Sequence, residues 1–275
     1  MTTLDTGTND LLARTEGHVA VISFNRPEAR NALSDAMYAG FDRVLPVIAT
    51  DPDIRVVMIT GEGGAFCAGG DVKGFAASHK SAGTSRPVSA EQGINRLRTI
   101  QRQVSLAIRR LPQPVVASFP GAAAGAGLSI GFAADLRIAA ERAIIVTAFA
   151  NIGASGDFGT SWFLPRIVGE AKAKELMFMS PRLSARDALS MNIVNAVLPN
   201  EGYEEAALSW CHELASRAPV ALQYIKQNIN RSLEVPLETA LDAEAVAMVR
   251  TMGTADHREA STAFVEKRPA NFTGS

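Results

Sequence analysis

The segment Ala65-Phe66-Cys67-Ala68-Gly69-Gly70-Asp71 follows a short run of mostly β-branched residues, Val56 to Thr60. That run predicts a strand, and the residues Gly61 to Gly64 predict the turn that ends it. The small residues that come next would let a ligand approach the backbone and would point N–H groups at it. We therefore expect a binding site just past the carboxyl end of this strand.

A second glycine-rich segment has the same position relative to another strand. Val115 to Phe119 predicts the strand, and the small residues Ala122 to Gly127 open a helix that runs toward Asp135. Unpaired N–H groups and the positive dipole end at such a helix start suit an oxyanion, so Gly125-Ala126-Gly127 is a candidate site. Because Ile130 stands where a dinucleotide fingerprint needs glycine, a Rossmann site is not expected.

Further runs along the chain predict the remaining strands and the first long helix. Val19 to Phe24 predicts a strand, and Leu136 to Ala139 with Ile144 to Thr147 predicts a strand pair. A helix that follows Ser34 should kink or end early at Pro46, because proline lacks the N–H that the helix needs. Alternating strands and helices favour an α/β fold.

The periodicity also divides the chain. We expect residues 1–12 to be a loose tail, residues 13–200 to form the core with the site, and residues 201–275 to form a helical region. The Ser/Gly/Pro-containing stretch from Ser78 to Ser89 predicts a mobile loop near the site.

Charge and cysteine usage limit the class of protein. The 275 residues carry a formal net charge of −1, and no apolar run approaches the roughly 18 residues that a membrane span needs. We expect neither a nucleic-acid partner nor a membrane partner. Cys67 and Cys211 show no spacing typical of a zinc site or a disulfide framework, so no metal is expected. With no export signal at its start, the chain is predicted to be soluble and cytoplasmic.

One motif suggests a different chemistry. Gly127-Leu128-Ser129-Ile130-Gly131 matches the G-x-S-x-G elbow of serine hydrolases, and Asp157 with His212 or His257 follows in the order of a catalytic triad. The elbow requires a strand that runs straight into the motif, whereas residues 120–126 intervene here. Serine hydrolysis therefore remains a remote alternative.

Several motifs follow one another along almost the whole chain, from about Val19 to Phe272. They are Asn25-Arg26-Pro27, Asn31-Ala32-Leu33, Phe66 to Asp71, Pro114 to Asp135, Leu164-Pro165-Arg166 with Val168-Gly169, and Ala263 to Arg268. These motifs and their order resemble those of the crotonase superfamily, also called the enoyl-CoA hydratase/isomerase family, and in detail those of the ring-type enoyl-CoA isomerases of phenylacetate breakdown.

This resemblance implies a ClpP/crotonase-like spiral of ββα units and a C-terminal helical trimerisation region, in a homotrimer or a dimer of trimers. It implies an acyl-CoA thioester as the substrate, with coenzyme A entering as part of that substrate and no permanently bound cofactor. The backbone N–H groups of Ala68 and Ala126 would form an oxyanion hole for the thioester oxygen. The residues implied to contact the coenzyme are Arg26, Ala29, Phe264 and Lys267.

The chain departs from the family pattern at the catalytic acids. Family members that hydrate enoyl-CoA use two glutamates, and this chain has Ser129 and Phe149 at those positions. It has Asp157 where the similar isomerases carry a functional aspartate. One carboxylate is enough for a 1,3-proton shift, whereas hydration needs one group to activate water and another to handle the proton at the α-carbon. The alternative is a structural role, in which Asp157 caps a helix that begins near Phe158.

The sequence therefore predicts an enoyl-CoA isomerase that uses Asp157, Ala68 and Ala126. Two alternatives remain open: an enoyl-CoA hydratase with a non-standard base, and a catalytically weak acyl-CoA-binding homologue. The side chains and backbone expected to line the acyl group are those of Ala65, Gly70, Asp71, Ser129, Phe149 and Trp162.

Overall fold

The computed structural model describes residues 1–71 and 89–275. Within these residues the main sheet has seven strands in the order β1-β2-β3-β4-β5-β7-β10. The first three strands pair antiparallel, and each later neighbour pairs parallel. The strands are β1 (Thr2–Leu4), β2 (Leu11–Glu16), β3 (Val19–Phe24), β4 (Val56–Gly61), β5 (Val115–Phe119), β7 (Leu136–Ala140) and β10 (Ala196–Leu198).

A second, smaller sheet supplies one strand to each ββα unit of the spiral. It contains β6 (Ala123–Ala124), β8 (Ile144–Val146) and β9 (Leu183–Ser184). The chain passes from β5 to β6 and then to α5 (Gly125–Ala133), and again from β7 to β8 and then to α6 (Thr160–Val168). The two strands predicted as a pair are therefore both present, but each pairs in a different sheet. The predicted α/β spiral of ββα units is confirmed.

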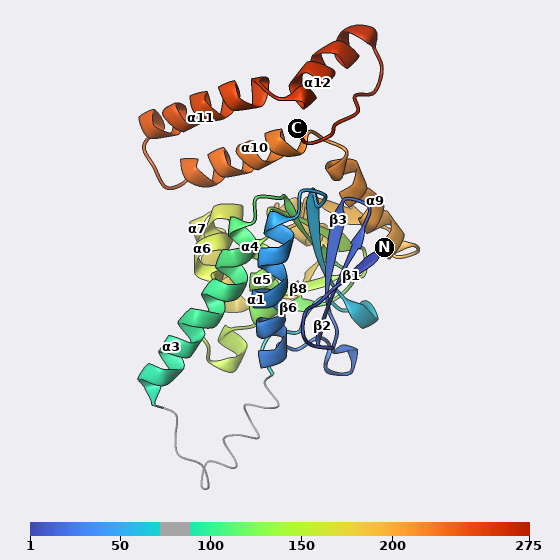
Figure 1. Ribbon diagram of the computed structural model, residues 1–275. Coiled ribbons are helices and arrows are strands. Elements are labelled where there is room, and N and C mark those ends of the chain that lie inside the picture. The colour runs from blue at the N-terminus through green and yellow to red at the C-terminus, as the bar shows by residue number, and fades with distance from the viewer. Residues whose placement is uncertain (72–88) are drawn as a thin grey trace.

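Helices cover both faces of the main sheet. On one face, α1 (Asp35–Thr50), the π-helical segment η3 (Arg102–Leu106) and α4 (Ala107–Arg110) lie with α5 and α6, while α3 (Ala90–Gln101) has no buried residue and extends away from the sheet (Figure 1). A chain of edge-on ring contacts links Phe41, Phe24, Phe66 and Phe119 in the core below them. On the other face, α9 (Tyr203–Ala215) packs on a second apolar cluster that includes Val21 and Met58.

The helix α1 continues through Pro46, so the predicted early end was wrong. Pro46 is exposed, and the buried residues Val44, Leu45 and Ile48 keep their contacts with the core. The carbonyl that loses its N–H partner at Pro46 belongs to the exposed residue Asp42, so water can replace the missing donor.

The N-terminal residues are not a loose tail. Thr2 to Leu4 form β1, which adds an antiparallel edge strand to β2. Asp5 forms an ion pair with Arg43 of α1, and the buried Thr6 hydroxyl donates to the carbonyl of Leu11 at 2.6 Å. Backbone pairing at the sheet edge orders a segment that has no apolar pattern of its own.

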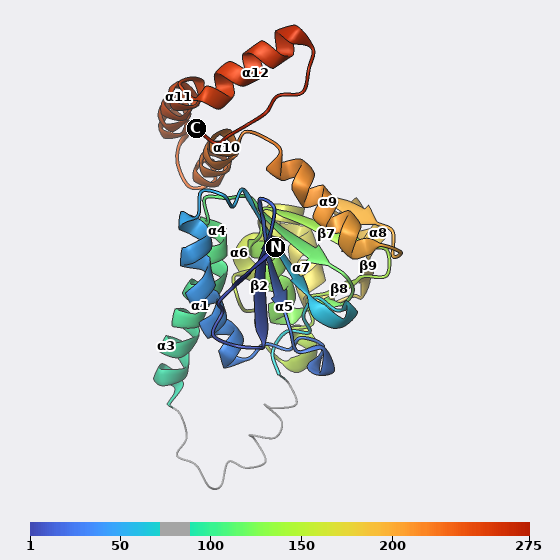
Figure 2. The same ribbon diagram turned by 45° about the vertical axis from the view of Figure 1, so that its right-hand side comes forward.

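The C-terminal helices lie beyond one end of the sheet (Figures 1 and 2). They are α10 (Pro219–Ser232), α11 (Leu237–Met252) and α12 (Ala255–Glu266), which confirms the predicted helical region. Lys226 of α10 ties them to the core, because its ammonium lies 2.7 Å from the Asp135 carboxylate and donates to the carbonyl of Gln113 at 2.9 Å. Burial lowers the pKa of Lys226, and the charge of Asp135 opposes that shift.

Two short helices complete the core: α7 (Glu170–Met179) and α8 (Ala185–Ser190). Ser184 and Asp187 form a capping box at the start of α8. No helix among the described residues is long and apolar enough to cross a membrane. Most of the loop predicted at Ser78 to Ser89 lies outside the described residues.

Candidate active site

The two glycine-rich segments lie against each other, as the family resemblance implied. Cys67 forms a parallel β-bridge with Ala123, and the N–H of Ala124 donates to the carbonyl of Cys67 at 2.9 Å. A Cβ atom on Gly69 would lie 3.1 Å from the nitrogen of Ala126. A Cβ atom on Gly127 would lie only 2.5 Å from the Cys67 sulfur. Glycine at these two positions is therefore what allows the backbones to approach.

Ala126 offers a donor at the start of α5. It is the second residue of that helix, and the N-cap residue Ala124 supplies no side-chain acceptor. Among the described residues no acceptor is present for the Ala126 N–H, as expected in the first turn of a helix. The dipole of α5 adds positive potential at this point.

Ala68 is placed differently. Its N–H already donates to the carbonyl of Arg30 at 3.0 Å, and Arg30 has a left-handed backbone with φ of 51°. An incoming oxygen would have to share this donor with Arg30 or displace its carbonyl. The two expected oxyanion donors are therefore close in space, but in this conformation they are not equivalent.

Asp157 lies in a sharply turned segment just before α6. Gly156, Phe158 and Gly159 all have positive φ. One carboxylate oxygen of Asp157 accepts the N–H of Phe158 at 2.7 Å and the side-chain amide of Gln101 at 2.8 Å. The N-cap of α6 is Gly159, and no side chain caps that helix, so the helix-cap interpretation of Asp157 was wrong.

The segment formed by α3 and η3 holds this turn at two points. Besides the contact from Gln101, the Ser105 hydroxyl donates to the carbonyl of Phe158 at 2.9 Å. Ser105 is buried and Phe158 is 1% exposed. These two contacts fix both the carboxylate and the backbone that carries it.

Tyr38 of α1 closes the other side of the turn. Its ring stacks on Phe158 with 5.7 Å between centroids. Burial raises the pKa of Tyr38, and the negative charge of Asp157 raises it further. The phenol therefore stays neutral, and it lies within electrostatic range of both the Asp157 turn and the first glycine-rich segment.

Ser129 links the two halves of the site without facing a ligand. It is fully buried, its hydroxyl donates to the carbonyl of Gly125 at 3.0 Å, and it pairs with the hydroxyl of Thr160. Because Thr160 begins α6 and its N–H donates to the carbonyl of Asp157, this pair connects α5 to the Asp157 turn. A substrate-contacting role for the Ser129 side chain is not supported by this burial.

The serine-hydrolase alternative also fails on geometry. Ser129 is in the middle of α5, not at a strand-to-helix turn. His212 of α9 lies against Gly17, and His257 is an exposed residue of α12. Neither histidine is a hydrogen-bond partner of Ser129.

The other expected lining residues have varied surroundings. Phe149 is buried, and Asp71 is half-buried at the end of the first described range, next to the half-buried Gly70. The carbonyl of Ala65 accepts the side-chain amide of Asn31 at 2.8 Å. Trp162 lies under the guanidinium of Arg166, 3.9 Å from its ring centroid, and packs edge-on against Phe163.

The residues expected to contact coenzyme A lie in two separate parts of the chain. Arg26 donates to the carbonyl of Ala32 at 2.8 Å, and Ala29 belongs to the short helix η1 (Pro27–Ala29). Phe264 of α12 is 85% exposed, and Lys267 is the exposed residue that ends this helix. No hydrogen bond or ion pair within the described residues joins Arg26 to either of them.

Sequence reasoning missed Gln101 and Tyr38. Tyr38 carries a weak signal, because it follows the core residue Met37 and precedes Phe41 by one helical turn. Gln101 carries none, since its partner Asp157 is 56 positions away. Within the described residues there is no cluster of acidic, histidine or cysteine side chains that could hold a metal ion.

The sequence model described as enoyl-CoA hydratase/isomerase matches residues 14–275 of the chain. The chain belongs to the enoyl-CoA hydratase/isomerase family. A similar curated relative, 1,2-epoxyphenylacetyl-CoA isomerase of Escherichia coli, is 33% identical over 96% of this chain and 98% of its own length. Short-chain-enoyl-CoA hydratase of Clostridium acetobutylicum is 32% identical over 94% of this chain and 96% of its own length.

Solved structures of this family have the same fold. The crystal structure of an enoyl-CoA hydratase from Polaromonas sp. JS666 superposes with a TM-score of 0.86 at 33% identity, over 96% of this chain and 99% of that one. An enoyl-CoA hydratase from Bacillus anthracis gives 0.86 at 32% identity, over 97% and 100%. The crotonase fold is thereby confirmed, while both isomerases and hydratases of this family are similar to the chain.

Proposed function

We propose that the protein is an enoyl-CoA isomerase that moves a double bond by a 1,3-proton transfer. The carboxylate of Asp157 takes a proton from C2 or C4 of the acyl chain, and the electron pair of that C–H bond moves into a dienolate. The thioester oxygen carries the resulting charge. The proton then returns from Asp157 to the other carbon, so that no water is consumed.

The observation that carries this proposal is the connected position of Asp157 and α5. The hydroxyls of Ser129 and Thr160 tie the helix that presents the Ala126 N–H to the turn that presents Asp157. A positioned general base contributes on the order of 10²- to 10⁴-fold in rate, and each oxyanion donor on the order of 10²- to 10³-fold. Both groups are expected in one pocket with the acyl thioester.

The two hydratase positions favour isomerisation over hydration. Ser129 is buried and satisfied by Gly125 and Thr160, and Phe149 is a buried hydrocarbon side chain. Neither side chain can activate water, and hydration requires one group for water and one for the carbon proton.

Separate incubations of the protein with a 3-enoyl-CoA and a 2-enoyl-CoA in deuterated water test the reaction. Conversion of the 3-enoyl ester with no 3-hydroxyacyl product is expected, and deuterium in the product measures how often the proton held by Asp157 exchanges with solvent before it returns to carbon. Accumulation of the 3-hydroxyacyl-CoA would instead establish a hydratase with a different base. In the Asp157→Asn variant, the amide oxygen can still accept from Gln101 and Phe158, so the turn is preserved and turnover should fall at least about 100-fold.

A second candidate function is acyl-CoA binding with little catalysis, and the contact of the Ala68 N–H with Arg30 is the observation that favours it. If that donor is never released, the thioester oxygen gains only one hydrogen bond. Difference infrared spectroscopy with a ¹³C-labelled thioester carbonyl separates the two. A shift of the carbonyl stretch to lower frequency supports the isomerase, and an unshifted stretch in a bound ester supports binding alone.

We further propose that α10 to α12 form the surface through which copies of the chain assemble into trimers. These helices together expose more large apolar side chains than the surface of a monomeric protein usually does, and such a surface is typical of an interaction site. Sedimentation should give a trimer or a multiple of it, and a monomer at micromolar concentration would refute this. The exposed side chains are Ile225, Ile229, Leu233, Leu237, Leu241, Val246, Met248, Val249, Met252, Phe264 and Val265.

A further inference from the structure

The face of the main sheet that α9 covers changes its chemistry along the strands. Near their starts, Val21, Met58 and Val116 pack into the apolar cluster under α9. Two residues further on, β3, β4 and β5 place Ser23, Thr60 and Ser118 on the same face, because side chains alternate along a strand. Three neighbouring strands therefore present hydroxyl groups at the same level.

The strand register aligns these hydroxyls in a row. Ser23 is the partner of Thr60 across β3 and β4. Ile59 is the partner of Ala117, which places Thr60 beside Ser118 across β4 and β5. The row lies at the carboxyl ends of parallel strands, where ligands of α/β proteins usually bind.

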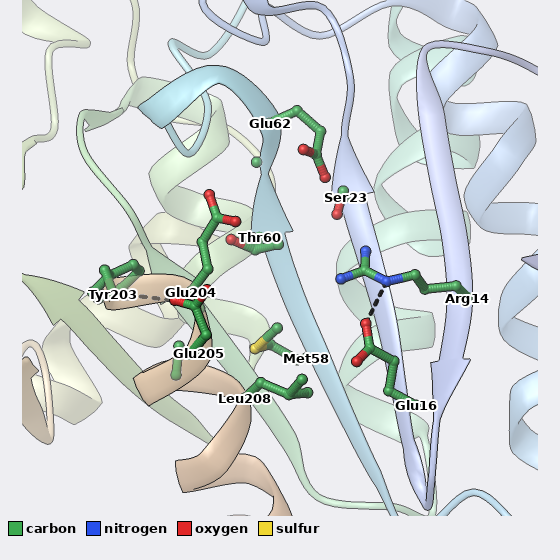
Figure 3. A pocket seen from close by; sticks show the side chains of 13 residues that line it. Arg14, Glu16, Ser23, Met58, Thr60, Glu62, Tyr203, Glu204, Glu205 and Leu208 are labelled. Atoms are coloured by element: carbon green, nitrogen blue, oxygen red, sulfur yellow. Dashed lines mark hydrogen bonds and ion pairs between the residues drawn. The ribbon is translucent and has the colours of Figure 1, made fainter. Parts of the chain in front are cut away.

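A pocket of about 410 Å³ opens above this row. Its volume is within the range of ordinary small-molecule sites. In Figure 3, Ser23 and Thr60 lie between α9 on one side and Arg14 with Glu16 of β2 on the other. The pocket is lined by Arg14, Glu16, Ser23, Met58, Thr60, Gly61, Glu62, Ser118, Tyr203, Glu204, Glu205, Ala207 and Leu208.

Ser23 is the unusual member of the floor. Its side chain is 0% exposed, and its hydroxyl has no hydrogen-bond partner among the described residues. In contrast, Ser118 pairs with the Tyr203 hydroxyl at 2.9 Å. A buried hydroxyl without a partner costs about 1–3 kcal/mol, so a protein that keeps one at the floor of a pocket has a group ready for a ligand.

The rim determines the charge of that ligand. Arg14 is paired with Glu16 at 2.7 Å, which neutralises both. Glu62, Glu204 and Glu205 have no ion-pair partner in the described part of the chain, so the pocket carries an excess of three carboxylates. Anions such as the phosphates of coenzyme A are therefore repelled here, and a cation is attracted.

We propose that this pocket is a second binding site, for a small amino alcohol. The ammonium group binds among the glutamates of the rim, and the hydroxyl group exchanges hydrogen bonds with Ser23 on the floor. The proposal is independent of the isomerase assignment, because it uses neither Asp157 nor the N–H groups of Ala68 and Ala126.

The site can be followed directly through Met58, which lines the pocket, in the full-length protein labelled with ¹³C in the methionine methyl groups. Addition of 3-amino-1-propanol at neutral pH should shift the Met58 methyl signal with a dissociation constant on the order of 1 mM, as suits a five-atom fragment. Met37, which is buried in the other apolar cluster, is the internal control and should not shift.

Matched probes test each half of the recognition. Propylamine lacks the hydroxyl, 1-propanol lacks the charge and 3-hydroxypropanoate reverses it, so all three should bind more weakly than the amino alcohol. An unshifted Met58 signal with the amino alcohol, or equal binding of 3-hydroxypropanoate, would overturn the proposal.

Variants give the second test. The double change Glu204→Gln and Glu205→Gln should weaken binding at least about tenfold, whereas Glu213→Gln, further along α9 and paired with Arg217, should leave it unchanged. Ser23→Ala should weaken binding roughly three- to tenfold without lowering the melting temperature, because it removes an unsatisfied group. A Ser23→Ala protein that melts earlier yet binds equally well would refute the role of Ser23.

Discussion

The side-chain amide of Gln101 donates to the carboxylate of Asp157 at 2.8 Å, across 56 positions of sequence. This contact, together with the one from Ser105 to Phe158, makes the α3–η3 segment the support of the proposed base. Gln101 donates to Oδ1 of Asp157 and acts on the substrate only through that side chain, so it is a positioning residue.

Gln101→Leu should reduce kcat for isomerisation roughly 10- to 100-fold with little change in KM, since a hydrogen bond to a charged group contributes about 1.5–3 kcal/mol. Gln103→Leu, two residues away, is the matched control. An unchanged kcat in Gln101→Leu, or a loss that falls on KM instead, would mean that the contact is only structural.

Gly127→Ala should destabilise the protein by about 1–3 kcal/mol or more, because its Cβ would lie 2.5 Å from the Cys67 sulfur in a packed core. Gly93→Ala is the control: it is a helical position of α3 with no atom within 4 Å of a new Cβ. That change should stabilise by about 0.5–1 kcal/mol. Urea unfolding of both variants measures the contrast, and equal effects would contradict the close approach.

The hydroxyls of Ser129 and Thr160 should behave as a pair. Ser129→Ala and Thr160→Val should each cost about 1–3 kcal/mol, since each leaves a buried partner unsatisfied. The double variant should cost clearly less than their sum, and a double-mutant cycle from unfolding curves measures the difference. Strict additivity would show that the two groups do not interact.

A phosphonate tests the serine-hydrolase alternative separately, and it should not label Ser129 of the wild-type protein.

Stability should decline in alkali through the two buried thiols. Burial raises the pKa of Cys67 and of Cys211 to about 12 from 9.0, so the unfolded chain loses these protons first. Their contribution is fully present below pH 9 and is lost as pH rises toward 12, by at most about 1.4 kcal/mol per pH unit for each thiol. Cys211→Ala should have a shallower loss than wild type in urea unfolding between pH 8.5 and 10. Identical slopes would contradict this.

The sequence predicted the parts of the fold that depend on local pattern. Val19 to Phe24 and Val115 to Phe119 are strands within the predicted bounds, because β-branched runs between turn residues fit few other structures. The pattern could not reveal that β7 and β8 pair in different sheets, since pairing depends on distant residues. Nor could it reveal β1, whose three residues gain their order from the backbone of β2.

The site divides in the same way. The family resemblance implied the approach of the two glycine-rich segments, and their small residues are what permit it. The burial of Ser129 and the support of Asp157 by Gln101 depend on contacts between helices far apart in sequence. The donor competition between Ala68 and Arg30 is likewise a tertiary effect, because Arg30 precedes Ala68 by a strand and a helix.

Because Gly127 packs on Cys67, the reactivity of the Cys67 thiol reports how often the two segments separate. In a Cys211→Ala background Cys67 is the single thiol of the chain, and a reagent reaches its sulfur only while α5 stands away from the segment that carries Ala68. The rate of labelling by an aromatic disulfide, followed by absorbance, therefore counts how often the two halves of the proposed oxyanion hole separate. If a bound acyl-CoA contacts both halves, a saturating concentration of the ester will lower the rate of Cys67 labelling. The ratio of the labelling rates without and with ester then gives the free energy by which the ester holds the two halves together.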